Sequence, residues 1–229
     1  MKISSGSYDL NKWLCGGYEC DVISVIYGSS GSGKTNLCLS ASVSQAKKGN
    51  KVLFVDTEGG FSSERVKQMA GEESEKVLGN IFVLSPTNFS EQKDAFEKLL
   101  EHIKKEGQKI GLIVVDGMTI LYRLDFADAK GKDGEFQKVN SELVRQMRTL
   151  SEISRKQNIP ILVTGQVYNW ENSSKLVGGD ILKYWGKCWI ELVNENGKRT
   201  VFLRKHRSLP EKSLGFQIVE SGIKKRGWI

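Results

Sequence analysis

The sequence predicts an α/β fold: a mainly parallel, twisted sheet flanked by helices. Two observations support this prediction. Short β-rich segments alternate with helix-like segments five times along the chain, an order typical of parallel sheets. Several β-rich segments are almost wholly apolar, as expected of strands that helices cover on both faces. With 229 residues, of which 39% are hydrophobic, we expect a single domain spanning residues 1–229.

The individual elements follow from apolar patterning and from turn residues. Gly49 is a suitable helix stop, and Asn88 or Ser90 a suitable helix start. After residue 185, the segments CWIELV, RTVFLRK and GFQIVES are joined by turns without a helix, so we expect C-terminal antiparallel strands to extend the sheet. The predicted strands are 22–27, 51–56, 80–85, 111–116 and 159–166, and the predicted helices are 35–49, 62–70, 89–107 and 135–157.

The segment YGSSGSGKT contains the pattern G-x-x-x-x-G-K-T, directly after an apolar strand and before a helix. In this context, a loop of small residues lets backbone N–H groups surround phosphates at a helix N-terminus. Lys34 is expected to reach the β- and γ-phosphates, and the Thr35 hydroxyl to bind Mg²⁺. The pattern predicts an ATP site with Mg²⁺ formed by Gly28, Ser29, Ser30, Gly31, Ser32, Gly33, Lys34 and Thr35.

A metal-binding carboxylate is expected at the end of a neighbouring buried strand. Asp116 follows four apolar residues in LIVVD and suits this position. Asp56, at the end of KVLFVD, is a rival on local pattern alone. We favour Asp116, because Asp56 leads into a segment whose next carboxylate, Glu58, has a separate candidate role.

Further segments make the chain resemble the core of RecA-type recombinases. GSSGSGKT, FVDTEGGFSSERV, LIVVDGMTILYR, TGQV and RSLPE occur in the family's order and spacing. The resemblance covers nearly the whole chain, DTEGGFSSER is far more specific than the phosphate loop, and the chain is most similar to the short archaeal RadB family. It implies a RecA-like P-loop NTPase core, in which Glu58 polarises the attacking water, Arg65 lies near the adenine and Gln166 couples the γ-phosphate to DNA. From the residues alone, Glu58 and Gln166 are polar groups at strand ends, where open α/β sheets bind ligands, although helix caps or solvated loop residues have the same pattern.

The formal net charge of +7 is concentrated at one end of the chain. Residues 183–229 hold eleven Lys and Arg against four Glu, so residues 1–182 are neutral overall. A basic region favours a polyanion such as DNA, although a solvated basic edge has the same composition. Lys205, His206 and Arg207 resemble the KHR signature of RadB proteins and suit phosphate contacts without base reading. Tyr168 and Trp170 are candidates for stacking on unpaired bases.

The chain departs from full recombinases in three places. The loop between Tyr122 and Phe136, which the resemblance assigns to DNA, has four acidic and three basic residues and is expected to be flexible and to bind DNA poorly. The second DNA loop, 167–179, is short. The phosphate loop begins at residue 28, which leaves no room for the family's N-terminal DNA-binding domain and its polymerisation linker. We therefore expect no filament of the usual kind.

These observations favour an accessory protein, a mediator or regulator of homologous recombination and DNA repair. We expect it to bind ATP, hydrolyse it slowly at best, and bind single- or double-stranded DNA without sequence preference. The resemblance implies the cell's RadA-type recombinase as a protein partner. A Holliday junction resolvase is a second candidate partner, and a homodimer is a candidate assembly. One alternative is an ATP-driven strand-exchange recombinase. A less favoured one is a P-loop small-molecule kinase, whose lid needs several arginines, whereas 123–135 has one.

The N-terminus lacks the apolar segment of a signal peptide, and no apolar run approaches the length of a membrane span. We expect a cytoplasmic protein without a membrane partner.

Overall fold

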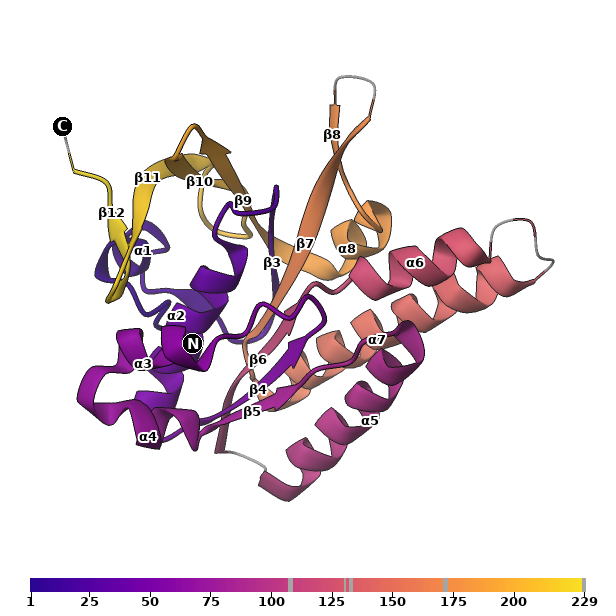
Figure 1. Ribbon diagram of the computed structural model, residues 1–229, viewed down its shortest axis with the longest axis horizontal. Coiled ribbons are helices and arrows are strands. Elements are labelled where there is room, and N and C mark those ends of the chain that lie inside the picture. The colour runs from indigo at the N-terminus through magenta and orange to yellow at the C-terminus, as the bar shows by residue number, and fades with distance from the viewer. Residues whose placement is uncertain (107–108, 130, 132–133, 171–172, 228–229) are drawn as a thin grey trace.

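In the computed structural model, helices cover both faces of one large sheet (Figure 1). The structure describes residues 1–106, 109–129, 131, 134–170 and 173–227. One face of the sheet is covered by α2, α3 and α4, and the other by α5 and α7, with α6 and α8 beside them. The helices are α1 (Tyr8–Trp13), α2 (Lys34–Lys47), α3 (Ser63–Ala70), the 3-10 helix η1 (Gly71–Glu73), α4 (Ser74–Leu78), α5 (Phe89–Glu106), α6 (Ile120–Asp128), α7 (Glu135–Gln157) and α8 (Gly179–Trp185).

The order of the strands confirms the predicted architecture. Among the described residues, the main sheet runs β12-β11-β10-β9-β3-β7-β6-β4-β5, with β8 paired to β7. The six strands from β9 to β5 are parallel, whereas β10, β11 and β12 are antiparallel to their neighbours. The strands are β1 (Lys2–Ile3), β2 (Tyr18–Glu19), β3 (Ile23–Gly28), β4 (Lys51–Asp56), β5 (Ile81–Leu84), β6 (Ile110–Asp116), β7 (Ile161–Trp170), β8 (Ser173–Leu176), β9 (Gly186–Glu195), β10 (Lys198–Lys205), β11 (Lys212–Val219) and β12 (Gly222–Lys225).

The apolar strands supply both hydrophobic clusters. In β4, Val52 and Phe54 pack on the side of α2, whereas Leu53 and Val55 pack on the side of α5 and α7. Successive side chains of a strand point to opposite faces, so a strand with helices on both sides must be apolar throughout. This explains why the continuous apolar segments predicted a parallel sheet.

The structure corrects three predictions. The segment CWIELV in β9 pairs antiparallel to β10, as expected, but it also belongs to the parallel part of the sheet because it pairs parallel to β3, since α8 precedes it and returns the chain to the end of the sheet where β3 begins. The segment after Tyr122 is not a loop throughout: α6 extends to Asp128, because Leu121 and Tyr122 are buried and Tyr122 stacks on Phe126. The chain after Gln166 continues as β7 and pairs with β8 as a hairpin.

Sequence reasoning also missed the N-terminal unit, in which β1 pairs with β2 around α1. The Ser7 hydroxyl caps α1 by accepting the Leu10 backbone N–H at 3.4 Å. Lys225 of β12 donates its backbone N–H to Asp9 at 2.8 Å. This small unit therefore packs against the end of the sheet formed by the C-terminal strands (Figure 1).

The described helices contain no stretch that is both long and apolar enough to cross a membrane.

Candidate functional site

The glycine-rich loop connects the end of β3 to the start of α2. Gly31 and Gly33 have φ values of 71° and 110°, a region that residues with side chains seldom adopt. A Cβ at Gly28 would lie 2.2 Å from the Leu192 carbonyl oxygen. This turn therefore requires glycine at these positions. The turn places the N-terminus of α2, with its free backbone N–H groups, beside the loop.

Lys34, the first residue of α2, is almost enclosed by the loop, with 6% of its surface exposed. Its Nζ donates to the carbonyl oxygens of Gly28 and Ser29 at 3.2 and 3.0 Å. Burial lowers the pKa of Lys34, and the carboxylates of Glu58 and Asp116 oppose this effect. The structure thus places a cation at the centre of the predicted phosphate site.

Asp116 lies at the end of β6 and is 1% exposed. Its two carboxylate oxygens accept hydrogen bonds from the hydroxyls of Thr35 at 2.7 Å and Thr164 at 2.6 Å. Burial raises the pKa of Asp116, and both hydroxyls oppose the rise. Oxygen donors of this kind suit Mg²⁺, and the predicted pair Thr35 and Asp116 is brought together.

Asp56, the rival carboxylate, has a different role in the structure. It accepts backbone N–H groups of Glu58, Gly60 and Phe61 at 3.3, 3.1 and 2.9 Å. These bonds fix the turn that follows β4, and they occupy both carboxylate oxygens. The geometry therefore supports the choice of Asp116 over Asp56.

Glu58 and Gln166 meet at the same end of the sheet, although 108 positions separate them. The Gln166 Nε2 donates to the Glu58 Oε2 at 2.7 Å, and Gln166 pairs in register with Gly28 across β7 and β3. Burial raises the pKa of Glu58, the hydrogen bond from Gln166 lowers it, and Asp116 raises it further. We call this end of the sheet, where Gly28, Asp56, Asp116 and Gln166 lie, the carboxyl edge.

Arg65 connects this site to the C-terminal strands. Its guanidinium donates to the carbonyl oxygens of Val219 at 2.7 Å and Glu220 at 2.9 Å, in the turn between β11 and β12. Its Nε donates to Asn36, one residue beyond Thr35, at 2.9 Å. The predicted position of Arg65 near an adenine stays a prediction; the structure shows that this side chain fixes the turn beside α2.

Sequence reasoning missed residues of the carboxyl edge that come from the C-terminal strands. Asn194 and Arg199, paired across β9 and β10, donate to the Gly31 carbonyl oxygen at 3.5 and 3.4 Å. Thr164 was also missed, although it directly precedes Gly165 and Gln166 in the quoted segment TGQV. The first two carried no local signal, because their position depends on β9 lying beside β3.

The basic turn Lys205, His206 and Arg207 lies at the opposite end of the sheet, which we call the amino edge because β3 and β9 begin there. Lys205 ends β10, and its Nζ donates to the Gly186 carbonyl oxygen at 3.4 Å. The turn therefore forms no part of the nucleotide site of its own chain.

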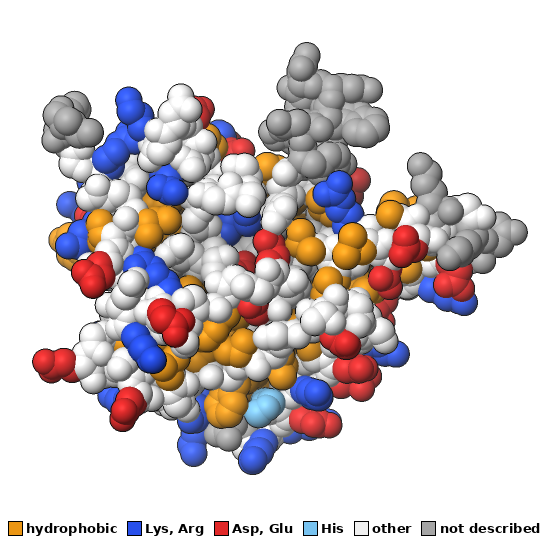
Figure 2. Space-filling view, in the orientation of Figure 1, with side chains coloured by type: hydrophobic (Ala, Val, Ile, Leu, Met, Phe, Trp, Pro, Cys, Tyr) orange, Lys and Arg blue, Asp and Glu red, His pale blue; other side chains and the backbone are white. Residues whose placement is uncertain are grey.

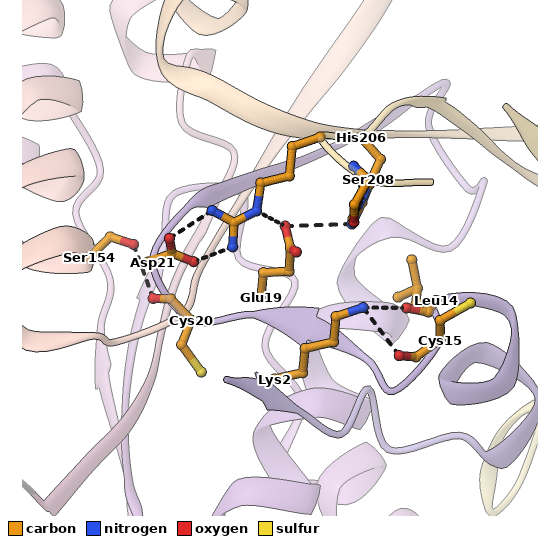
Figure 3. Close-up of polar contacts among 10 residues, drawn as sticks. Lys2, Leu14, Cys15, Glu19, Cys20, Asp21, Ser154, His206 and Ser208 are labelled. Carbon is orange, nitrogen blue, oxygen red and sulfur yellow. Dashed lines mark hydrogen bonds and ion pairs between the residues drawn. The ribbon is translucent and has the colours of Figure 1, made fainter. Parts of the chain in front are cut away.

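Two carboxylates missed by sequence reasoning meet the basic turn (Figure 3). Arg207 holds Asp21 through two hydrogen bonds of 2.7 and 2.6 Å, and its Nε lies 3.0 Å from Glu19. The His206 side chain is only 1% exposed and faces Glu19 at 3.5 Å. His206 is thus enclosed and not free to meet a phosphate in this arrangement, whereas phosphate contact by Lys205 and Arg207 stays a prediction.

Burial lowers the pKa of His206, although Glu19 raises it. The hydrogen bond from Arg207 lowers the pKa of Asp21. Burial thus favours the neutral form of His206 and the contact with Arg207 favours the ionised form of Asp21, and the contacts of both groups tie β2 and the residues after it to the turn after β10.

Tyr168 and Trp170 occupy the end of β7, and their side chains lie outside what the structure describes.

Charge is unevenly distributed over the face of the molecule that Figure 2 shows. Figure 2 shows Lys and Arg side chains over β10 to β12 and frequent carboxylates along α6 and α7.

Comparisons with known proteins cover nearly the whole chain. The Rad51 family model matches residues 1–226. The chain is 39% identical over 222 residues to the DNA repair and recombination protein RadB of Methanobrevibacter smithii, covering 93% of this chain and 92% of that protein. It is 38% identical over 214 residues to the protein of the same name from Methanocaldococcus jannaschii, covering 93% and 98%.

A solved structure described as the RadB recombinase superposes with a TM-score of 0.80 at 33% identity, covering 98% of this chain and all of that chain. The similarity spans both the carboxyl edge and the C-terminal antiparallel strands.

Proposed function

Because this chain belongs to the Rad51 family and resembles archaeal RadB proteins of DNA repair and recombination, we propose that it is an ATP- and DNA-binding accessory protein of homologous recombination. The observation that carries the proposal is the convergence of Lys34, Thr35, Asp116 and Glu58 at the carboxyl edge. A cation, a metal-binding hydroxyl and two carboxylates are the groups that ATP with Mg²⁺ requires.

Two further observations support the fit of ATP with Mg²⁺. The Ser32 hydroxyl is buried and has no hydrogen-bond partner among the described residues, so the loop holds a polar group that a phosphate oxygen can satisfy. Gly60 lies beside Thr35 and Asp116. A Cβ at this position would lie 3.3 Å from the Thr35 hydroxyl, so a side chain there would fill space next to the two groups that would hold the metal ion. Bound Mg²⁺ would neutralise phosphate charge, and Thr35 and Asp116 would hold the ion.

Weak hydrolysis is proposed from the geometry of Glu58. Its carboxylate can orient a water molecule and accept its proton, as a general base does. The hydrogen bond from Gln166 stabilises the ionised form and reduces its proton affinity. The same bond connects the nucleotide site to the β7–β8 hairpin, so a change at Glu58 can reach the segment that the resemblance assigns to DNA.

An accessory role, in place of strand exchange, is supported by the segment after Tyr122. This segment is helical to Asp128, and Asp125 and Asp128 lie on the helix. Fixed carboxylates repel a polyanion, so this part of the chain contributes little to DNA binding, and the basic C-terminal region is left as the main candidate.

Protein partners are proposed from the family. We infer that the cell's RadA-type recombinase and a Holliday junction resolvase bind this protein, and that it can form a homodimer. Analytical ultracentrifugation of the protein, alone and mixed with each candidate, would reveal a complex of the summed mass. An unchanged profile in every mixture would count against these partners.

One set of assays on a single preparation tests the proposed function. ATP turnover, ATP affinity and affinity for labelled DNA are measured, each with and without the other ligand, together with strand exchange and filament formation on single-stranded DNA. We expect ATP and DNA binding, slow turnover, and neither strand exchange nor filaments. Efficient strand exchange by the protein alone would identify a recombinase instead. The absence of any DNA binding would refute the proposal.

A further inference from the structure

A cavity of about 550 Å³ opens at the amino edge, far from the glycine-rich loop along β3. Its walls come from the first residues of β3 and β9, from one turn of α7, from the end of α8 and from the basic turn. Its volume lies within the range of small-ligand sites. The residues that line it are Asp21, Val22, Ile23, Ser151, Ser154, Arg155, Tyr184, Trp185, Lys187, Lys205, His206 and Arg207.

The lining is strongly basic. It includes Arg155, Lys187, Lys205 and Arg207, whereas Asp21 is the only carboxylate among the lining residues that the structure describes. Arg207 is already paired with Asp21. The other three cations have no carboxylate partner among the described residues, and the Nζ atoms of Lys187 and Lys205 each meet only a backbone carbonyl. Three positive charges thus face one cavity without a carboxylate partner in the described part of the chain.

The same cavity has an aromatic wall. Tyr184, near the end of α8, is 72% exposed, and its ring lies edge-on to that of Trp185 at 5.1 Å between centroids. Trp185 packs against the hydrophobic cluster on the α7 side of the sheet and so anchors this wall. A large aromatic side chain left so exposed does not stabilise the core, whereas it offers a flat face to a ligand.

We propose that this cavity binds one nucleotide unit of single-stranded DNA. The base stacks on Tyr184, and the flanking phosphates contact Arg155, Lys187 and Lys205. Aromatic faces beside cations bind unpaired strands without regard to sequence, because every base has a stacking face. This inference rests on the DNA binding in the proposed function and names its location, which lies at the opposite edge of the sheet from ATP.

The first experiment measures binding of a fluorescein-labelled oligothymidylate to the full chain over a range of salt. The double variant Arg155→Ala, Lys187→Ala is expected to bind more weakly, with a salt slope shallower by about 1.4, since each lost phosphate contact on a single strand removes about 0.7. The matched control Lys93→Ala, Lys98→Ala removes the same charge from α5 and should leave the slope unchanged. Equal slopes for both double variants would overturn the site.

The second experiment tests stacking separately from charge. Tyr184→Ala is expected to lose at least about fivefold in affinity for the oligonucleotide, since stacking one base on an aromatic side chain is worth at least that factor. Tyr184→Phe should retain the affinity, and the salt slope should stay constant in both. Equal losses in Tyr184→Ala and Tyr184→Phe would show that the ring face does not bind a base.

Two outcomes separate this site from the proposed function. If the wild type binds oligonucleotide and the cavity variants bind it equally well, the site is wrong while the proposed function stands; absence of any oligonucleotide binding refutes both. A third arm uses Lys34→Ala, which removes the ATP site at the glycine-rich loop. Efficient displacement of the oligonucleotide by ATP from this variant would show that the cavity takes free nucleotides, which overturns the assignment to a DNA strand.

Discussion

The charged residues at the two edges of the sheet differ in burial and in the kind of partner they have. At the carboxyl edge, Lys34 and Asp116 are buried, and their polar partners are the loop's own carbonyls and two hydroxyls. At the amino edge, Arg207 is held by two carboxylates and stays partly exposed. The first arrangement leaves charges that a bound ligand can neutralise, whereas the second neutralises Arg207 within the chain, although Lys187 and Lys205 nearby meet only backbone carbonyls among the described residues.

This difference shows that a cluster of basic residues in a sequence is a weaker guide to ligand binding than a loop with a defined backbone. The glycine-rich loop requires a particular backbone conformation, which its residues dictate locally. The net contribution of a basic turn depends on which carboxylates fold against it, here Glu19 and Asp21, far away in the sequence.

The largest expected effect is at Glu58. Glu58→Gln should reduce ATP turnover by about 100-fold or more, since a general base contributes about 10²- to 10⁴-fold, while ATP affinity changes little. Steady-state turnover and a titration with fluorescent ATP check the two parts. Glu64→Gln, an exposed glutamate of the same segment, is the control. Equal turnover in wild type and Glu58→Gln would exclude Glu58 as the base.

The pH dependence of turnover sharpens this prediction. Burial raises the pKa of Glu58, and the base must be ionised to accept a proton. Turnover should therefore fall as the pH drops through a range above that of an ordinary glutamate, about 4.3. A pH profile of turnover checks this, and a midpoint at or below the ordinary value would contradict it.

Lys34→Ala is expected to weaken ATP binding about 10- to 100-fold, because a hydrogen bond between charged groups contributes about 1.5–3 kcal/mol. The thermal midpoint should stay near that of the wild type, since Lys34 contributes no apolar packing. Isothermal titration calorimetry and thermal unfolding measure the two quantities. The exposed Lys93→Ala on α5 serves as control, and unchanged ATP affinity in Lys34→Ala would remove the assignment of the carboxyl edge.

Asp21→Asn tests whether the amino edge is neutralised by its own carboxylates. Removing one of the two carboxylates that hold Arg207 should raise the affinity for oligothymidylate by up to about fivefold, the effect of roughly 1 kcal/mol for one exposed ion pair. The salt slope should become steeper by about 0.7 for the additional phosphate contact. Asp94→Asn on α5 is the matched control. An affinity and a salt slope no higher than those of Asp94→Asn would show that Arg207 binds no phosphate.

The smallest effect is expected at His206. Burial lowers the pKa of His206 in the folded chain. Glu19 raises this pKa, whereas the positive charges of Lys2, Arg207 and Lys212 lower it further. Below the ordinary value of about 6.5, the unfolded chain therefore binds more protons, and stability falls as the pH decreases. The midpoint of thermal unfolding should decrease by about 2–4 °C for each kcal/mol lost.

Thermal unfolding of wild type and His206→Gln at pH 7.5 and 5.5 checks this effect. The variant cannot titrate at this position, so its decrease should be smaller. An equal decrease in both proteins would show that other groups cause it.

Most of the fold could be predicted, because its signals are local. The apolar strands and the helix at 135–157 were predicted within a few residues. Thr35 was predicted from the glycine-rich pattern, Asp116 from the end of an apolar strand, and the roles of Glu58 and Gln166 from the resemblance to recombinases; the structure brings these four residues to one edge. The direction of β9 could not be inferred, because it depends on α8, which had no clear periodicity. The partners of Arg207 were missed because 186 positions separate it from Asp21.

The position of β3 has a consequence for how the chain folds during synthesis. Its neighbours are β7 and β9, so Ile23 pairs with Ile161 and Val25 with Trp189. At about 5–20 residues per second, the strand that carries the glycine-rich loop stays without either neighbour for several seconds to about half a minute. Such distant pairings slow folding, and an apolar strand without neighbours is prone to aggregate. A nascent chain stalled before residue 161 should therefore depend more on chaperones than one stalled after residue 195.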